Sequence, residues 1–170
     1  MNYLSKDFNH DYISQRIKLT WKEILYGIEK NYIYPDVAIE FAINEVSEKE
    51  EYPEELIELA SLTKEESVHP YLKRLVDSEE TQEDDVIRDK WLYLILDWIY
   101  NNKDKYLDSL QIVEEIYAEF DYPEQITTFV RYMPSDAPDL GSAQLNEERL
   151  YRNWKSYLDS QKEQFSTSIE

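Results

Sequence analysis

The feature that most constrains the fold is the segment 86–100, in which apolar side chains occupy every face of a helix. A surface helix keeps one polar face toward water, whereas a helix that is apolar all round has to be buried. Its longest strongly apolar run, residues 91–96, is far shorter than the roughly 20 residues that a membrane-spanning helix needs. The segment therefore predicts the central helix of an all-α domain.

Apolar residues recur at helical spacing along almost all of the remaining chain, and no convincing alternating run typical of a β-strand occurs. At 170 residues the chain fits one domain, or two very small ones, and can bury a substantial core. We therefore predict a single compact all-α domain over residues 1–170, with about seven or eight helices. The expected helices cover approximately residues 8–17, 20–30, 35–46, 63–76, 86–100, 108–119, 123–131 and 145–163, with another that begins near residue 53.

Two of these helices begin with the pattern of a capping box, at Thr20-Trp21-Lys22-Glu23 and at Thr63-Lys64-Glu65-Glu66. In a capping box the Thr hydroxyl and the Glu carboxylate each accept a hydrogen bond from an otherwise free backbone N–H. Pro70 falls in the first or second turn of the second helix, which leaves the start of that helix open. Two prolines and Gly141 predict an irregular segment at 133–143.

The sequence also contains an internal echo at an offset of 70 residues, with Tyr52-Pro53-Glu54 matching Tyr122-Pro123-Glu124 and Trp21 matching Trp91. Apolar residues also recur at the same offset of 70 residues, although helical chains match at apolar positions by chance. The echo leads to the hypothesis of two stacked three-helix units, residues 20–63 and 90–133, followed by a C-terminal helix at 145–163. The residues expected to have a structural role are Trp21, Trp91, Trp98, Tyr52, Pro53, Tyr122, Pro123 and Trp154.

The net charge of −19 is concentrated in the middle of the chain. Residues 31–125 carry 26 Asp and Glu against 8 Lys and Arg, whereas residues 1–30 have a net charge of +1 and residues 126–170 one of −2. A surface this negative repels nucleic acid and anionic membranes and attracts basic proteins. We therefore expect a basic protein partner, and neither a nucleic acid nor a membrane as partner.

The usual residues of catalytic and metal sites are scarce, because the chain has no Cys and only two His. Glu66-x-x-His69 has the spacing that places both side chains on one helix face, and Asp7-x-x-His10 is a formal second match. A di-iron bundle needs two such motifs and two further carboxylates, and the second match lies in a weakly patterned segment. No phosphate-binding glycine loop and no nucleophile elbow occurs. We therefore expect no catalytic residue, no metal and no cofactor, and a protein that is not an enzyme.

Candidate binding residues come from the polar, acidic connector at 78–85 and from the irregular loop 131–141. Exposed loops have binding roles more often than helices do. Tyrosine suits interfaces because its ring packs against apolar groups while its hydroxyl stays hydrated. The alternatives are that the acidic residues are solvated helix ends and that the loop is a proline-stiffened linker. The predicted partner-binding residues are Glu79, Glu80, Glu83, Asp84, Asp85, Tyr132, Asp136 and Asp139.

The stretches 20–27, 33–42, 90–93, 120–124, 129–134 and 150–151 resemble a bacterial domain-of-unknown-function family, number twenty-two forty-seven. The resemblance covers about residues 15–160. It implies an α-helical, cytoplasmic, uncharacterised protein, and it supplies no catalytic residues. Families of this size and charge are often immunity proteins that neutralise a secreted toxin encoded by a neighbouring gene. This expectation rests on analogy with such families.

The leading hypothesis is a non-catalytic protein that binds a basic partner, such as a toxin, through an acidic surface that bears tyrosines. One alternative is a small-molecule enzyme or ligand sensor with a pocket between the helical units, and another is a structural adaptor. The N-terminal residues contain no apolar stretch of signal-peptide length, which leads us to expect a cytoplasmic protein.

Overall fold

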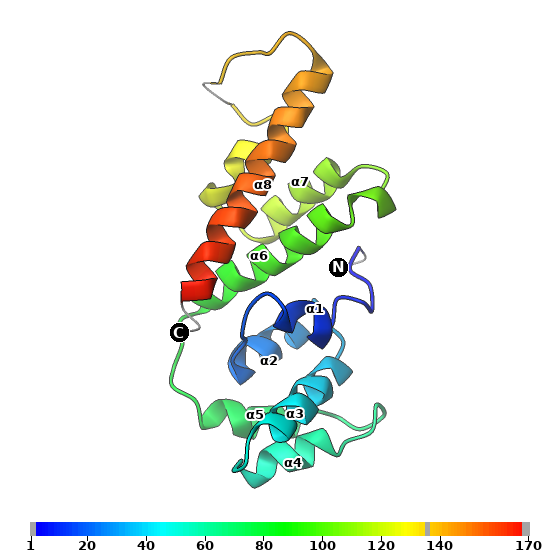
Figure 1. The fold of residues 1–170 in the computed structure, drawn as a ribbon, viewed down its shortest axis with the longest axis vertical. Coiled ribbons are helices and arrows are strands. Elements are labelled where there is room, and N and C mark those ends of the chain that lie inside the picture. The colour runs from blue at the N-terminus through cyan, green and yellow to red at the C-terminus, as the bar shows by residue number, and fades with distance from the viewer. Residues whose placement is uncertain (1–2, 135–136, 168–170) are drawn as a thin grey trace. The chain divides into compact units, whose positions relative to one another are not determined.

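The computed structural model of the chain describes residues 3–134 and 137–167 (Figure 1). Every regular element in these residues is a helix, which confirms the all-α prediction. The chain divides into two compact units, Met1–Ile87 and Arg88–Glu170, each with its own apolar core. The expectation of a single domain over residues 1–170 stays a prediction.

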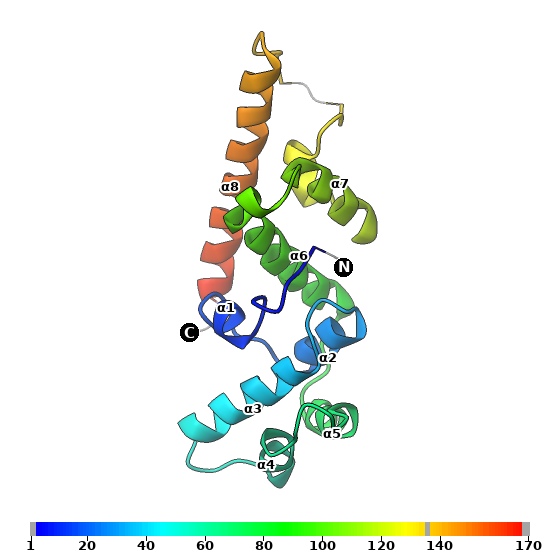
Figure 2. The ribbon, with the colours of Figure 1, turned by 90° about the vertical axis from the view of Figure 1, so that its right-hand side faces the viewer.

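The first unit contains five helices in its described residues, and α4 packs against both α3 and α5 (Figure 2). Helix α2 packs against α5, and α1 against α3. The core is built from residues of every helix, including Ile13, Ile24, Val37, Leu56 and Leu72. The helices are α1 (His10–Ser14), α2 (Trp21–Glu29), α3 (Asp36–Glu48), α4 (Glu54–Ala60) and α5 (His69–Asp77).

The capping box predicted at the start of α2 is present. The Glu23 backbone N–H donates to Thr20 Oγ1 (3.1 Å), and the Thr20 backbone N–H donates to Glu23 Oε1 (2.7 Å). These two bonds satisfy N–H groups that the first helical turn leaves without a partner. Helix α2 therefore begins at Trp21, as the sequence predicts.

The helix predicted to begin at Thr63 begins later, at His69. Thr63 and Glu66 do pair, because the Thr63 backbone N–H donates to Glu66 Oε1 (3.1 Å), but they form an isolated turn. Pro70 explains the difference: in a helix interior its ring would clash with the carbonyl group of residue 66. At the first turn of α5 the same proline is tolerated, since no intrahelical N–H is needed there.

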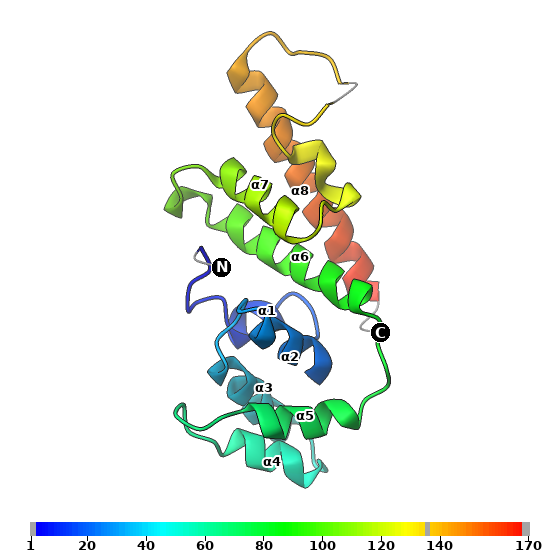
Figure 3. The same ribbon diagram turned by 180° about the vertical axis from the view of Figure 1, so that it is seen from behind.

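The second unit is formed around α6 (Asp84–Asn101), which begins at the end of the first unit. Every residue of α6 from Trp91 to Ile99 is buried, as predicted for the segment without a polar face. Helix α7 (Ser109–Glu119) lies alongside α6 (Figures 1 and 3). The other elements are the 3₁₀ helices η1 (Lys103–Lys105) and η2 (Glu124–Phe129) and the long helix α8 (Ala143–Thr167).

Aromatic rings join η2, α6 and α8 in the core of the second unit. Trp154 of α8 stacks on Phe129 of η2, with ring centroids 5.9 Å apart and parallel planes, and meets Tyr100 of α6 edge to face at 5.2 Å. Segment 124–129 forms a 3₁₀ helix instead of the predicted α-helix. Three successive β-branched residues, at 126–128, favour this departure because such side chains fit poorly in an α-helix.

The residues predicted to serve the structure differ in burial. Trp91, Trp98 and Trp154 are buried in the second unit, whereas Trp21 and Tyr52 are half-buried in the first. The two Tyr-Pro-Glu motifs both lead into helices, since α4 begins at Glu54 and η2 at Glu124. Pro53 and Tyr122 are exposed, and Pro123 is half-buried.

The 70-residue echo remains a hypothesis. Trp21 is the first residue of α2, whereas its counterpart Trp91 lies deep inside α6. Val37 is buried, but the matching Leu107 is exposed. The matched positions therefore do not occupy the same environments throughout.

Candidate functional site

The Glu66-x-x-His69 motif does not form one helix face. His69 is the first residue of α5, and Glu66 lies in the preceding turn, where it pairs with Thr63. The His69 imidazole Nε2 lies 3.8 Å from Glu29 Oε1, and both side chains are largely exposed. The expectation of a shared helix face is wrong because Pro70 delays the start of the helix.

His10 serves to pack α1 against α3. Only 12% of its side chain is exposed, and its ring meets Phe41 edge to face at 4.6 Å. Its Nδ1 lies 3.2 Å from Asp11 Oδ1, while Asp7 is exposed and precedes the helix. Over residues 3–134 and 137–167, no three His, Asp or Glu side chains are grouped closely enough to hold a metal ion.

Glu79, predicted to bind a partner, caps helix α2. The Trp21 backbone N–H donates to its Oε2 (2.9 Å), and the Lys22 backbone N–H donates to its Oε1 (2.9 Å). A carboxylate at this end of a helix also interacts favourably with the positive end of the helix dipole. Both oxygens of Glu79 are therefore engaged within the first unit.

Gln82 strengthens the same contact between the connector and α2. Its side-chain amide donates to Glu23 Oε2 (3.2 Å) and accepts from the Thr20 hydroxyl (3.2 Å), while Lys22 Nζ donates to its backbone carbonyl (2.7 Å). Glu23 is completely buried, so these polar partners compensate for the loss of its hydration. The acidic connector is thus fixed to α2 at two points.

The other four partner-binding residues predicted in the connector, Glu80, Glu83, Asp84 and Asp85, are exposed. Asp84 and Asp85 are the first two residues of α6, where the helix dipole favours negative side chains. This position supports the interpretation of these two residues as solvated helix-end residues.

The predicted loop is fixed to α8 beyond Pro138. Asp139 Oδ1 accepts from the Asn146 side chain (3.0 Å) and from the Gly141 backbone N–H (2.9 Å), and both bonds lower the pKa of the Asp139 carboxyl. Arg149 donates to the Pro138 carbonyl (2.6 Å). Asp139 therefore holds the loop against the helix, which supports the linker interpretation, and Asp136 lies outside the described residues.

Before this fixed part of the loop, Arg131 forms two ion pairs with α7. Its Nη2 lies 2.8 Å from Asp108 Oδ2, and its Nε lies 3.1 Å from Glu114 Oε1. Burial alone would lower the pKa of Arg131, but the hydrogen bonds to Asp108 and Glu114 outweigh it and raise that pKa. Asp108 also caps α7, since its Oδ1 accepts from the Gln111 backbone N–H (3.3 Å). The start of α7 and the start of the loop are thus held together.

Each residue of the Asp108–Arg131 pair adjoins an exposed apolar side chain. Leu107 precedes Asp108 and is fully exposed at 110%, and Tyr132 follows Arg131 and is 90% exposed. Tyr132 also has a φ of +65°, a left-handed backbone conformation that a bulky aromatic residue rarely adopts. We call Leu107, Asp108, Glu114, Arg131 and Tyr132 the Tyr132 surface.

The segment that contains Leu107 and α7 is acidic. Residues 104–121 contain six Asp and Glu and a single Lys, and Arg131 is already paired with two of these carboxylates. Glu115, Glu119 and Asp121 are exposed on α7 or directly after it. The Tyr132 surface therefore offers an aromatic and an aliphatic side chain beside the start of an acidic helix.

Sequence reasoning identified Tyr132 but missed Leu107 and the Arg131 bridge. Asp108 before a helix is a recognisable N-cap, and a hydrophobic residue before an N-cap usually packs back on the first turns of its helix. Leu107 does not do so, because it is fully exposed. Only the three-dimensional structure shows that Asp108, next to Leu107, pairs with Arg131, next to Tyr132.

Among the described residues, no helix combines the length and the apolar character needed to cross a membrane. No curated protein and no solved structure matches the chain. A family model described as "Uncharacterized protein conserved in bacteria (DUF2247)" matches residues 10–162. The match covers most of the chain and agrees with the resemblance noted from its aromatic residues. The chain therefore belongs to the DUF2247 family.

Proposed function

We propose that this protein is a non-catalytic binding protein that engages a basic protein partner through the Tyr132 surface. The observation that carries the proposal is the pair Leu107 and Tyr132, both exposed and both adjacent to the Asp108–Arg131 ion pair. Exposed apolar residues that occur singly are normal, but two that flank one ion pair offer a contact site.

The energetics of interfaces favour this arrangement. Tyrosine is enriched among the residues that dominate binding, because its ring buries a large area while its hydroxyl keeps a polar partner. The strained backbone of Tyr132 is compatible with a functional role, since such strain concentrates at binding sites. The Arg131 bridge holds the loop in place before binding, which reduces the entropy lost on association.

The charge of the region supports a basic partner. The exposed carboxylates of α7, the helix that begins at Asp108, attract a basic surface, so they raise the association rate more than the affinity. A basic toxin is one partner of this kind, and blocking it would be steric and electrostatic. The cytoplasmic location expected from the sequence belongs to the same proposal.

Site-specific photo-crosslinking in the native cell tests the proposal. A benzoylphenylalanine at position 132 should crosslink to a protein with a high isoelectric point, because the side chain lies in the interface. The same group at Tyr122, which is 62% exposed and also has a positive φ, provides the matched control. Equal crosslinking from both positions, or crosslinking only to acidic proteins, would contradict the proposal.

A further inference from the structure

The ring of Tyr132 already has a cation over it. The Cζ atom of Arg131 lies 5.7 Å from the ring centroid, within the distance of about 6 Å at which a cation and an aromatic face attract each other. Other tyrosines of the chain make the same kind of contact with Lys or Arg while half-buried, namely Tyr12, Tyr26, Tyr71, Tyr100 and Tyr151. Tyr132 differs because it is 90% exposed, so its ring is open to a group from outside the chain.

The cation over the ring belongs to a group of side chains with a net negative charge. Arg131 lies 2.8 Å from a carboxylate oxygen of Asp108 and 3.1 Å from one of Glu114, so one positive charge faces two negative charges. The formal charge of the three side chains is therefore −1. The face of an aromatic ring is negative as well. A second cation on the open face of the ring would therefore meet attraction from the ring and from the group behind it.

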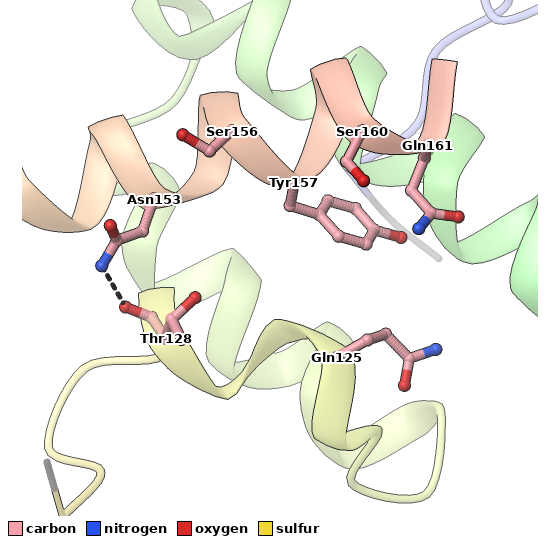
Figure 4. Close-up of a pocket in the computed structure, with 7 residues that line it drawn as sticks. All are labelled: Gln125, Thr128, Asn153, Ser156, Tyr157, Ser160 and Gln161. Carbon is pink, nitrogen blue, oxygen red and sulfur yellow. Dashed lines mark hydrogen bonds between the residues drawn. The ribbon is translucent and has the colours of Figure 1, made fainter. Parts of the chain in front are cut away.

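The backbone that carries Tyr132 is fixed before any partner arrives. The side-chain amide of Asn153 in α8 donates to the Thr128 carbonyl near the end of η2 (2.8 Å), as Figure 4 shows. The next residue, Phe129, stacks on an indole ring of α8, and Arg131 is held by its two ion pairs. The segment that leads into Tyr132 is thus anchored at three positions, which reduces the conformational entropy lost when the ring binds a partner.

We infer that the open face of the Tyr132 ring binds an arginine side chain of the basic partner, so that the ring lies between this arginine and Arg131. The inference rests on the proposed function and names the contact that the partner makes. A guanidinium group suits an exposed ring better than the ammonium group of lysine does, because it is planar, stacks on aromatic faces and is more weakly hydrated.

Fluorine NMR of the full chain at low salt tests this inference, with hexaarginine as the probe. The resonance of 4-fluorophenylalanine at position 132 should shift saturably, and hexalysine should bind there about twofold to fivefold more weakly. Pentafluorophenylalanine at position 132 keeps the ring but reverses the charge of its face, so its resonances should report binding of hexaarginine weakened about twofold to fivefold. The same two substitutions at Tyr122, which is 62% exposed, are the matched control and should give equal affinities.

The inference is overturned by the absence of a saturable shift at position 132, by equal affinity of the two peptides there, or by equal affinity of the two fluorinated rings. Affinity capture from the native cell separates this test from that of the proposed function. The chain with 4-fluorophenylalanine at position 132 should retain more of the basic protein than the chain with pentafluorophenylalanine. Equal retention by both baits overturns the inference and leaves the proposed function standing, whereas retention of no basic protein by either bait contradicts both.

Discussion

At the scale of single residues, neighbouring acidic positions of the connector have different roles. Glu79 accepts two backbone hydrogen bonds from α2, whereas Glu80, the next residue, is exposed. Composition cannot distinguish the two residues, because the partners of Glu79 lie 58 and 57 residues away in the sequence. The difference arises from tertiary structure.

Glu79→Ala should therefore lower the free energy of unfolding by about 1–2 kcal/mol, the usual effect of losing a helix cap. Glu80→Ala is the matched control and should change it by less than about 0.5 kcal/mol. Denaturant unfolding followed by circular dichroism measures both changes. Equal effects of the two substitutions would show that Glu79 does not cap α2 in solution.

Tyr132 presents the opposite case, a residue whose local conformation is unfavourable. Its φ of +65° costs about 1–2 kcal/mol for a residue with a Cβ atom, and its exposed ring offsets only part of this through Arg131, whose Cζ lies 5.7 Å from the ring centroid. Tyr132→Gly should therefore leave the free energy of unfolding unchanged or raise it by up to about 1 kcal/mol. Tyr132→Ala keeps the strain and should give no gain. Thermal unfolding checks this, and a marked loss of stability in the glycine variant would contradict the strain.

At the scale of elements, sequence periodicity predicted most helices because each has an apolar face of its own. The capping box located the start of α2, and the all-apolar segment located α6. The errors at α5 and η2 came from local backbone chemistry, namely Pro70 and a run of β-branched residues. In the candidate site, loop composition pointed to Tyr132, but Arg131 pairs with Asp108 across 23 residues, which no periodicity reveals.

The loop before α8 provides a pH test at the same scale. Hydrogen bonds from Asn146 and Gly141 lower the pKa of Asp139, so they favour the charged form of its carboxyl. Their stabilising effect is present above the ordinary pKa of an aspartate and is lost as the pH falls through the lowered value. An NMR titration should show that Asn146→Ala moves the pKa of Asp139 upward. An unchanged titration would show that the loop is not fixed to α8 in this way.

At the scale of the whole molecule, the acidic character extends to both units. Residues 1–87 carry 21 Asp and Glu against 9 Lys and Arg, and residues 88–170 carry 16 against 9. Both units therefore contribute to a long-range field that attracts basic partners. Specific contact requires something more local, which the Tyr132 surface provides.

If the long-range field and the local contact act separately, substitutions in the acidic connector should change the association rate and leave the dissociation rate nearly unchanged. Lys at positions 83, 84 and 85 in place of Glu83, Asp84 and Asp85 should slow association and weaken its salt dependence, with little change in dissociation. Surface plasmon resonance at low and at physiological ionic strength measures both rates. An unchanged association rate would exclude these three residues from the attraction.

The most direct test is affinity capture from the native cell at low salt, with three forms of the protein as bait. The wild-type chain should retain a basic protein, and a double variant with Leu107→Ser and Tyr132→Ser should retain at least tenfold less, equivalent to about 1.4 kcal/mol or more. A control with Tyr122→Ser and Leu145→Ser changes two other exposed apolar residues and should retain as much as the wild type. Retention of the same protein by all three baits, or of no basic protein by the wild type, would contradict the account.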